Sequence, residues 1–248
     1  MSLFVDVVLS PGETLPEVDS WIVIDILRAT TTMCAFFDGG GRILFPAASV
    51  EEGILLRDRL EMDGKPVCLM GERNALPPPG FDLGNSPLEL LAADPSERPV
   101  AVMATSNGTR ALLRAASSGK PVWAACARNA SAVLQKAVKK GNSIGILCAG
   151  RLGRTALDDA ACAGLLVDTL LREGDAILED GAHMALSVWK SGNGDLPALL
   201  CKSAHGRLLG GLGFGGDLEY ASVIDTSQAA PFLAERRGLI AVCPGEEP

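Results

Sequence analysis

The chain has 248 residues, of which 48% are hydrophobic and 4% aromatic, and its formal net charge at pH 7 is −8. The apolar fraction suffices for a buried core, whereas the acidic balance and the lack of any Lys/Arg run exclude a nucleic-acid-binding protein. No apolar run is long enough to span a bilayer and no signal-peptide pattern is present. Seven widely spaced cysteines without a C-x-x-C pair indicate reduced thiols, so we expect a cytoplasmic protein without a membrane partner.

Short apolar runs bounded by turn residues recur along the chain and predict buried strands. In chain order these are Phe4–Leu9, Trp21–Leu27, Arg42–Phe45, Val67–Met70, Val100–Ala104, Val122–Cys126, Ile144–Cys148, Ala221–Ile224 and Leu239–Val242. The clearest segments with helical spacing are Thr30–Phe37, Val50–Met62, Thr109–Ser117, Ala130–Lys139 and Leu157–Leu171. This alternation predicts a layered α/β/α fold with a largely parallel or mixed sheet. We expect residues 1–248 to form one structural unit, with two similar lobes as the alternative arrangement.

Three of the predicted strands run directly into a polar turn followed by a helix. The turns are Asp25–Thr32, Thr105–Thr109 and Cys148–Thr155. Ligands of α/β proteins bind at the carboxyl ends of strands, and free N–H groups at a helix N-terminus attract anions. The three turns therefore predict a pocket for phosphate or sulfonate groups.

The first turn carries Asp25 at the end of an apolar strand, where an unpaired carboxylate is costly. It needs a metal, an arginine or several donors, and Arg28 is suited to bidentate contact with phosphate. The hydroxyls of Thr30, Thr31 and Thr32 are suited both to capping the helix and to facing an anion. An Asp–Arg pair beside an ordinary N-cap is the alternative interpretation.

The second turn offers small donors from Ser106, Asn107 and Thr109, and Gly108 would allow close approach of the backbone. An ordinary capping turn explains it nearly as well. The third turn has the spacing C-x5-R from Cys148 to Arg154, as in cysteine-dependent phosphatases. That hypothesis requires a thiolate of lowered pKa. A packed small hydrophobe at the end of a strand is the simpler interpretation of Cys148.

Two acidic residues, Asp158 and Asp159, open the helix that follows the third turn. They complement the helix dipole, and they would equally suit a hard cation such as Mg²⁺. A long loop after Met70 contains Arg73 and Asn85 and is stiffened by three prolines. Loops of this length are often functional, so we expect its polar side chains to close over a substrate; a stiff surface connection is the alternative.

Several of these segments together resemble the 2-phosphosulfolactate phosphatase family. In chain order they are Asp25–Thr32, Gly71–Arg73, Gly80–Pro87, Thr105–Thr109, Cys148–Gly150, Ser203–Gly206, Gly213–Phe214 and Asp217. The resemblance covers nearly the whole chain. It implies Mg²⁺-dependent hydrolysis of (2R)-2-phospho-3-sulfolactate to 3-sulfolactate and phosphate, a step of coenzyme M biosynthesis in archaea. The family often has Glu-Asp where this chain has Asp158-Asp159, so a shorter carboxylate stands at the first position.

The two lines of argument combine into one mechanistic hypothesis. Asp25, Asp158 and Asp159 would hold Mg²⁺, which positions or activates a water, with Asp25, Arg28 and Asp159 as the catalytic residues. The phosphoryl oxygens would be bound by Arg28 and by the turns Thr30–Thr32 and Ser106–Thr109. Arg73 and Asn85 would bind the sulfonate or the carboxylate, and an aspartyl-phosphate at Asp25 is the alternative chemistry.

Two rival functions remain open at this point. A cysteine-dependent phosphatase would use Cys148 and Arg154 and need no metal, and a non-catalytic protein would bind small anions without turnover. The apolar content is also compatible with a homodimer.

Overall fold

The computed structural model of the chain describes residues 2–245 apart from residues 63, 65 and 237. The strands in this part are β1 (Leu3–Val8), β2 (Ser20–Ile24), β3 (Ile43–Ala47), β4 (Val67–Gly71), β5 (Val100–Ala104), β6 (Val122–Ala125), β7 (Ser143–Cys148), β8 (Ala176–Leu178), β9 (Phe232–Arg236) and β10 (Leu239–Cys243). The helices are α1 (Ala29–Asp38), α2 (Val50–Glu61), α3 (Pro87–Ala92), α4 (Gly108–Ala116), α5 (Ala130–Ala137), α6 (Leu157–Glu173), α7 (Asp180–Ser191), α8 (Leu196–Lys202), α9 (Ala204–Gly211) and α10 (Gly215–Ser222), with a short 3-10 turn, η1 (Ala127–Asn129).

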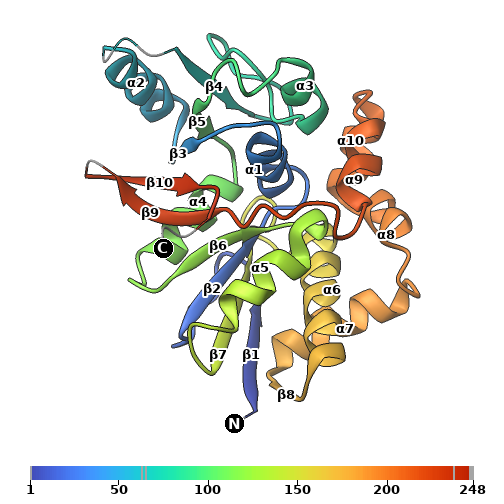
Figure 1. Cartoon of the computed structure of the whole chain (residues 1–248). Helices are drawn as coiled ribbons and strands as arrows, with labels where there is room; N and C mark the ends of the chain where they lie inside the picture. The colour runs from blue at the N-terminus through green and yellow to red at the C-terminus, as the bar shows by residue number, and fades with distance from the viewer. Residues whose placement is uncertain (1, 63, 65, 237, 246–248) are drawn as a thin grey trace.

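The strands form one mixed sheet in the order β4-β5-β3-β10-β9-β6-β2-β7-β1-β8. Parallel pairing joins β4, β5 and β3 into one set and β6, β2, β7, β1 and β8 into another. The hairpin β9–β10 lies between them and pairs antiparallel with β6 on one side and β3 on the other. The two parallel sets consequently run in opposite directions, and Figure 1 shows them above and below the red hairpin.

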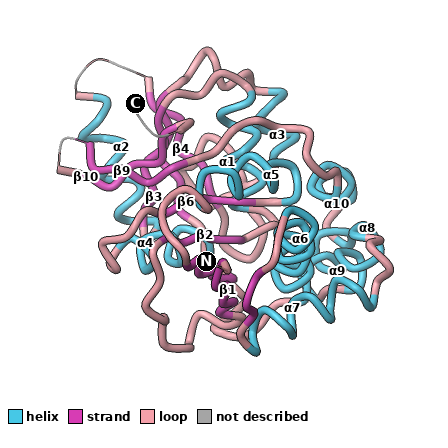
Figure 2. The backbone as a smooth tube through the Cα atoms, turned by 60° about the horizontal axis from the view of Figure 1, so that its bottom comes forward, coloured by secondary structure: helices cyan, strands magenta, loops and turns pink. Residues whose placement is uncertain are grey.

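Helices cover both faces of each strand set, as a layered fold requires. On β2, Ile22 and Ile24 pack in the core cluster that includes α5 and α6, whereas Trp21 and Val23 pack in the cluster that includes α1 and α4. The alternation follows from the period of two along a strand whose faces are both buried. In Figure 2, helices α6–α9 gather on one side of the molecule, away from α2. The predicted α/β class is confirmed.

Most predicted strands and helices are present, and one prediction is wrong. Ala221–Ile224 was expected as a strand, but α10 continues to Ser222, and Val223 and Ile224 follow it without a strand partner. These two residues are 44% and 39% exposed, so the end of the apolar run lies at the surface and not in the sheet. A run of four apolar or small residues does not distinguish a strand from the end of a helix.

The long loop after β4 returns along its own strand. The backbone N–H of Asp82 donates to Leu69 O at 2.9 Å, and the Asp82 carboxylate accepts from Leu69 N at 2.8 Å. Arg98 also lies 3.3 Å from this carboxylate. Asp82 therefore holds the loop against the sheet edge. The earlier part of the loop, around Ala75, reaches the other strand set, where Arg28 donates to Ala75 O.

None of the helices in the described part of the chain is long and apolar enough to cross a membrane.

Candidate active site

The carboxyl ends of the two strand sets meet, and this meeting point gathers the polar turns. The turn after β2 begins at Asp25 and the turn after β5 runs into α4 at Gly108. A Cβ atom added to Gly108 would lie 2.5 Å from the Cβ of Ala29 and 2.6 Å from a carboxylate oxygen of Asp25. Only glycine permits this approach, so the close contact expected at Gly108 is present and is made with the opposite strand set.

Two carboxylates at this junction are buried and make no ion pair with a lysine or arginine in the described part of the chain. Asp25 is 7% exposed, and burial, followed by the nearby charge of Glu72, raises its pKa to about 7. Asp158, at the start of α6, is 2% exposed, and burial raises its pKa to about 6. The charge of Asp158 also raises the pKa of Asp25, so the two groups lie close enough to interact. Buried acids with this repulsion are typical of functional sites.

The other two acids at the junction hold turns together. Asp159 accepts from the backbone N–H groups of Ile26 at 3.0 Å and Gly150 at 2.8 Å, and so ties the turn after β2 to the turn after β7. Burial and the neighbouring charges of Asp158 and Asp25 raise its pKa well above the ordinary value. Glu72 accepts from Ser106 N at 2.7 Å and Ala75 N at 3.1 Å, and so ties the turns after β5 and β4.

Arg28 is buried and lies in a network that spans three segments. Its guanidinium donates to the Asp217 carboxylate of α10 at 2.6 Å and to Ala75 O at 2.9 Å, and it stacks 4.4 Å from the ring centroid of Phe214. The Ser86 hydroxyl donates to the second oxygen of Asp217 at 2.7 Å. Arg28 therefore joins the turn after β2 to the β4 turn and to α10.

The other residues of the first turn also use their hydroxyls locally. Thr30 Oγ1 accepts from Asp25 N at 3.1 Å, Thr31 Oγ1 donates to Ile26 O at 2.7 Å, and Thr32 Oγ1 donates to Asn85 O at 3.0 Å. Asn85 is 2% exposed and its Oδ1 has no hydrogen-bond partner in the described part of the chain. These bonds shape the turn and bring the long loop onto α1.

In the second turn, Thr105 and Thr109 form a reciprocal pair. Thr109 N donates to Thr105 Oγ1 at 3.0 Å, and Thr105 N donates to Thr109 Oγ1 at 3.2 Å. Asn107 precedes α4 without a side-chain cap. Ser106 and Asn107 are half-buried and line a cleft of about 310 Å³, whose wall also includes Arg110 and Gly153.

The geometry of Cys148 opposes the cysteine-dependent hypothesis. The thiol is fully buried, and burial together with the charges of Asp159 and Asp158 raises its pKa well above the ordinary value. A nucleophilic cysteine requires the opposite shift and an accessible sulfur. Cys148 is therefore a packed side chain at the end of β7.

A second pocket adjoins Asp158. It has a volume of about 370 Å³, and its wall includes Arg151, Arg154, Thr155 and His205. His205 Nδ1 lies 3.8 Å from the Asp158 carboxylate, and burial lowers the His205 pKa to about 4, so the ring is neutral at pH 7. The sequence predictions gave no role at the site to Arg151, His205 or Asp217, and they placed Glu72 only among the polar side chains of the long loop. The available signals were the Arg in the third turn and the Ser203–Gly206 and Asp217 segments.

Arg73, expected at the sulfonate or carboxylate, lies on the β4 turn. Its guanidinium donates to Glu72 O at 2.6 Å and to Ala104 O at 3.4 Å. It therefore fastens the turn after β4 to the end of β5, on the opposite strand set from Arg151.

The side chains at the junction fit a hard divalent cation by their chemistry. Within the described residues, no three His, Cys, Asp or Glu side chains form a ready-made metal site. Mg²⁺, however, is often held by one or two carboxylates together with waters and substrate phosphate. Asp25 and Asp158 supply two such carboxylates, and burial raises the pKa of each.

Opposed strand ends, buried acids and arginine-lined pockets define an α/β protein that handles small anions. Comparison with known proteins gives the particular family: the model described as 2-phosphosulpholactate phosphatase matches residues 8–236. A relative from Thermus thermophilus, named "Probable 2-phosphosulfolactate phosphatase", is 40% identical over 239 residues, covering 96% of this chain and 97% of the relative. Relatives of the same name from Deinococcus radiodurans (40% identical, covering 94% of this chain and 93% of the relative) and Thermotoga maritima (35%, covering 92% and 95%) also match. The chain belongs to the 2-phosphosulfolactate phosphatase family.

Proposed function

We propose that this protein is a Mg²⁺-dependent phosphoric monoester hydrolase that converts (2R)-2-phospho-3-sulfolactate to 3-sulfolactate and phosphate. Family membership over nearly the whole chain supports the reaction. The observation that carries the metal requirement is the pair of buried carboxylates Asp25 and Asp158 at the junction of the strand sets, each with a pKa raised by burial.

Asp25 and Asp158 would hold the metal ion, which would neutralise phosphate charge and help to activate a water. Asp159 keeps the turns after β2 and β7 in register through its two backbone hydrogen bonds, so its role includes positioning Asp25. Arg28 positions the same turn from the other side through Asp217 and Ala75. Ser106, Asn107 and the start of α4 line the cleft beside Asp25 and would bind phosphoryl oxygens.

The test is phosphate release from 2-phosphosulfolactate with Mg²⁺, then with EDTA, then with Mg²⁺ restored. We expect turnover that EDTA stops and added Mg²⁺ recovers. Turnover that survives EDTA would contradict the metal requirement. Binding of 3-sulfolactate without any phosphate release would instead support a small-anion-binding protein.

The proposal includes a cytoplasmic location, which suits a small charged metabolite and buried free thiols such as Cys34. Fractionation of cells that produce the protein would test it.

A further inference from the structure

The turn after β7 is a two-residue hairpin that places two arginines opposite each other. Arg151 N donates to Arg154 O at 2.8 Å and Arg154 N donates to Arg151 O at 3.0 Å. The residues between them, Leu152 and Gly153, have φ values of 53° and 76°, as a type I′ turn requires. Directly opposite residues of such a pair carry Cβ atoms about 4.5–5.5 Å apart on one side of the ribbon. The hairpin therefore places two arginine side chains on the same side of the ribbon, and both line one pocket.

This arrangement is unfavourable for the protein alone. Like charges directly opposite each other in a strand pair are destabilising. Within the residues that the structure describes, neither guanidinium makes a hydrogen bond or an ion pair, although the charge of Arg151 lowers the pKa of Asp158. A bound anion between the two side chains would relieve the repulsion.

The hairpin forms one wall of the pocket of about 370 Å³ described above. Thr155 contributes a hydroxyl to this wall, and Asp158 lies at its inner side. The pocket therefore adjoins Asp158, one of the two carboxylates proposed to hold the metal ion that would bind the phosphate. A volume of this order suits a small organic anion. A ligand with its phosphate at these carboxylates would place a neighbouring anionic group near the arginines.

We propose that Arg151 and Arg154 bind the sulfonate group of the substrate and thereby select phosphoesters that carry a second strong anion. This inference rests on the proposed function and assigns a specificity site within it. A tetrahedral sulfonate has three oxygens, enough to accept hydrogen bonds from both guanidinium groups at once.

The test compares 2-phosphosulfolactate with 2-phospholactate, which lacks the sulfonate, in the presence of Mg²⁺. We expect the double variant Arg151→Gln/Arg154→Gln to lose about 10- to 100-fold in kcat/KM for 2-phosphosulfolactate, mainly through KM, because charge-assisted hydrogen bonds are lost. Its kcat/KM for 2-phospholactate should change by less than about threefold. Arg172→Gln, which removes an exposed arginine paired with Asp168 on α6, is the control for loss of an arginine away from the pocket and should leave both values unchanged.

Equal losses on both substrates, or no loss on either, would overturn the sulfonate assignment. If the wild-type protein hydrolyses neither substrate, the proposed function fails, but calorimetric binding of 3-sulfolactate and lactate still tests the hairpin. We then expect tighter binding of 3-sulfolactate by the wild type and at least about tenfold weaker binding by the double variant. Failure of the wild type to bind 3-sulfolactate, or equal affinity of the two proteins, would refute the inference.

Discussion

The turns after β7 and β4 have the same backbone design and different side chains. Each strand ends in a two-residue hairpin with positive φ at both central residues, Leu152-Gly153 in one and Asn74-Ala75 in the other. Each hairpin is tied to the neighbouring turn by one carboxylate that accepts two backbone N–H groups, Asp159 in the first case and Glu72 in the second.

The two turns differ in the arginine side chains that take no part in these bonds. In the β4 turn, Arg73 faces Leu76 and donates to the backbone oxygens of Glu72 and Ala104. In the β7 turn, Arg151 faces Arg154, and both guanidinium groups line a pocket. The same contrast holds for the neighbouring strands β2 and β5. The residue that follows β2 is Asp25 and the residue that follows β5 is Thr105, and the backbone N–H of each donates to a threonine hydroxyl. The half with β2 and β7 thus carries Asp25, Asp158 and the two pocket arginines, whereas the half with β4 and β5 carries hydrogen-bonded turns, including the one proposed to bind phosphoryl oxygens.

The largest expected effect comes from removing the charge that distinguishes the two halves. Asp25→Asn should reduce turnover of 2-phosphosulfolactate by about 10³-fold or more, because a charged group at the reacting phosphate is lost. Phosphate release measures the effect, and circular dichroism checks that the variant is folded. Thr105→Val, the corresponding change in the other half, should leave turnover within about tenfold and cost about 1 kcal/mol of stability through its lost capping bond. Near-normal activity of the Asp25 variant would contradict the asymmetry.

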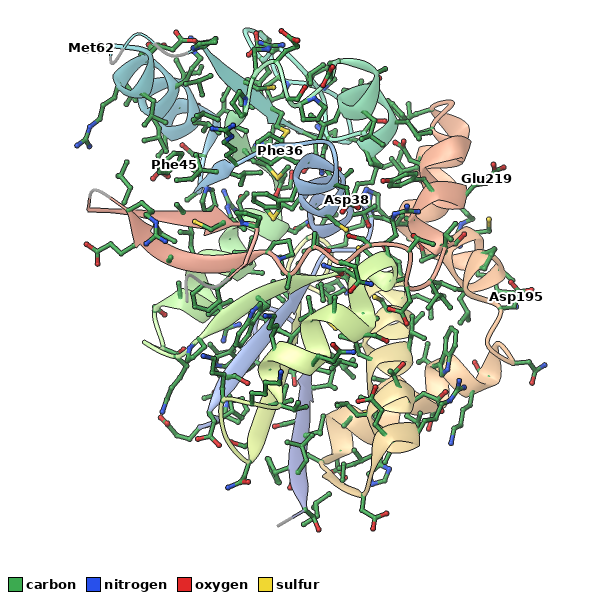
Figure 3. The ribbon with its side chains drawn as sticks, viewed as in Figure 1. Phe36, Asp38, Phe45, Met62, Asp195 and Glu219 are labelled. Atoms are coloured by element: carbon green, nitrogen blue, oxygen red, sulfur yellow. The ribbon has the colours of Figure 1, made fainter. Side chains whose placement is uncertain are left out.

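The next largest effect comes from breaking the connection between the halves. Asp217→Ala should lower the free energy of unfolding by about 3–5 kcal/mol, because it leaves the buried Arg28 guanidinium without its carboxylate. Urea denaturation measures this change. Glu219, labelled in Figure 3, lies on the exposed side of the same helix, so Glu219→Ala is a matched control with an expected change within about 0.5 kcal/mol. Equal stability of the two variants would show that the ion pair does not join the segments.

The buried acids also predict how stability depends on pH in the metal-free protein. Burial raises the folded-state pKa of Asp25 to about 7, above its ordinary value of 3.8, so its protonated form is favoured by folding. Its contribution to stability is therefore present below pH 4 and is lost as the pH rises toward and through 7. In EDTA, Asp25→Asn should become more stable than the wild type by up to a few kcal/mol as the pH rises from about 4.5 to 7.5.

Paired urea titrations at several pH values measure that difference, and added Mg²⁺ should reduce it. A stability difference that stays constant with pH would show that folding does not raise the pKa of Asp25. The comparison between variants is needed because Asp19 and Asp94, whose pKa values are lowered by hydrogen bonds to Ser143 and Ser96, contribute in the opposite direction.

A smaller effect is expected at the β4 turn. Arg73→Gln should reduce kcat/KM by only about threefold, because the guanidinium is already hydrogen-bonded to backbone oxygens and an uncharged donor partly replaces it. The reduction should be the same for 2-phosphosulfolactate and 2-phospholactate. A selective loss with the sulfonated substrate would assign the sulfonate to Arg73, one of the two groups that the sequence predicted for it, and would remove the contrast between the turns.

The smallest effect is expected at Cys148. Because the thiol is fully buried with a raised pKa, Cys148→Ala should leave kcat within about twofold and cost only the stability of one small packed side chain. Complete loss of turnover in a folded variant would restore the cysteine mechanism.

Local pattern in the sequence was sufficient for the α/β class, for most strands and for the polar turns that end them. Apolar runs such as Trp21–Ile24 and Val100–Ala104 are short and buried on both faces, so their identity as strands depends on their own residues. Asp25 could also be recognised as a candidate site residue from the sequence, because a carboxylate in an apolar segment is costly to bury without a partner. The family resemblance was likewise recognisable from the order of the turn motifs, and the family match confirms it.

The tertiary structure decided what those turns meet. The hairpin β9–β10 joins the two strand sets through antiparallel pairs, so the set with β4 and β5 runs opposite to the set with β2 and β7. Because the sets are opposed, Gly108 lies against Asp25 and Ala75 accepts a hydrogen bond from Arg28. Arg28 and Asp217 are 189 positions apart, and nothing near either residue specifies the other. The strand predicted at Ala221–Ile224 was wrong for a related reason. A short apolar run fits a strand and the end of a helix equally well, and here tertiary packing extends α10 into it. Sequence determines which groups need partners, because burial and charge are properties of residues; the choice of partner depends on strand direction and packing, which arise only when distant segments come together.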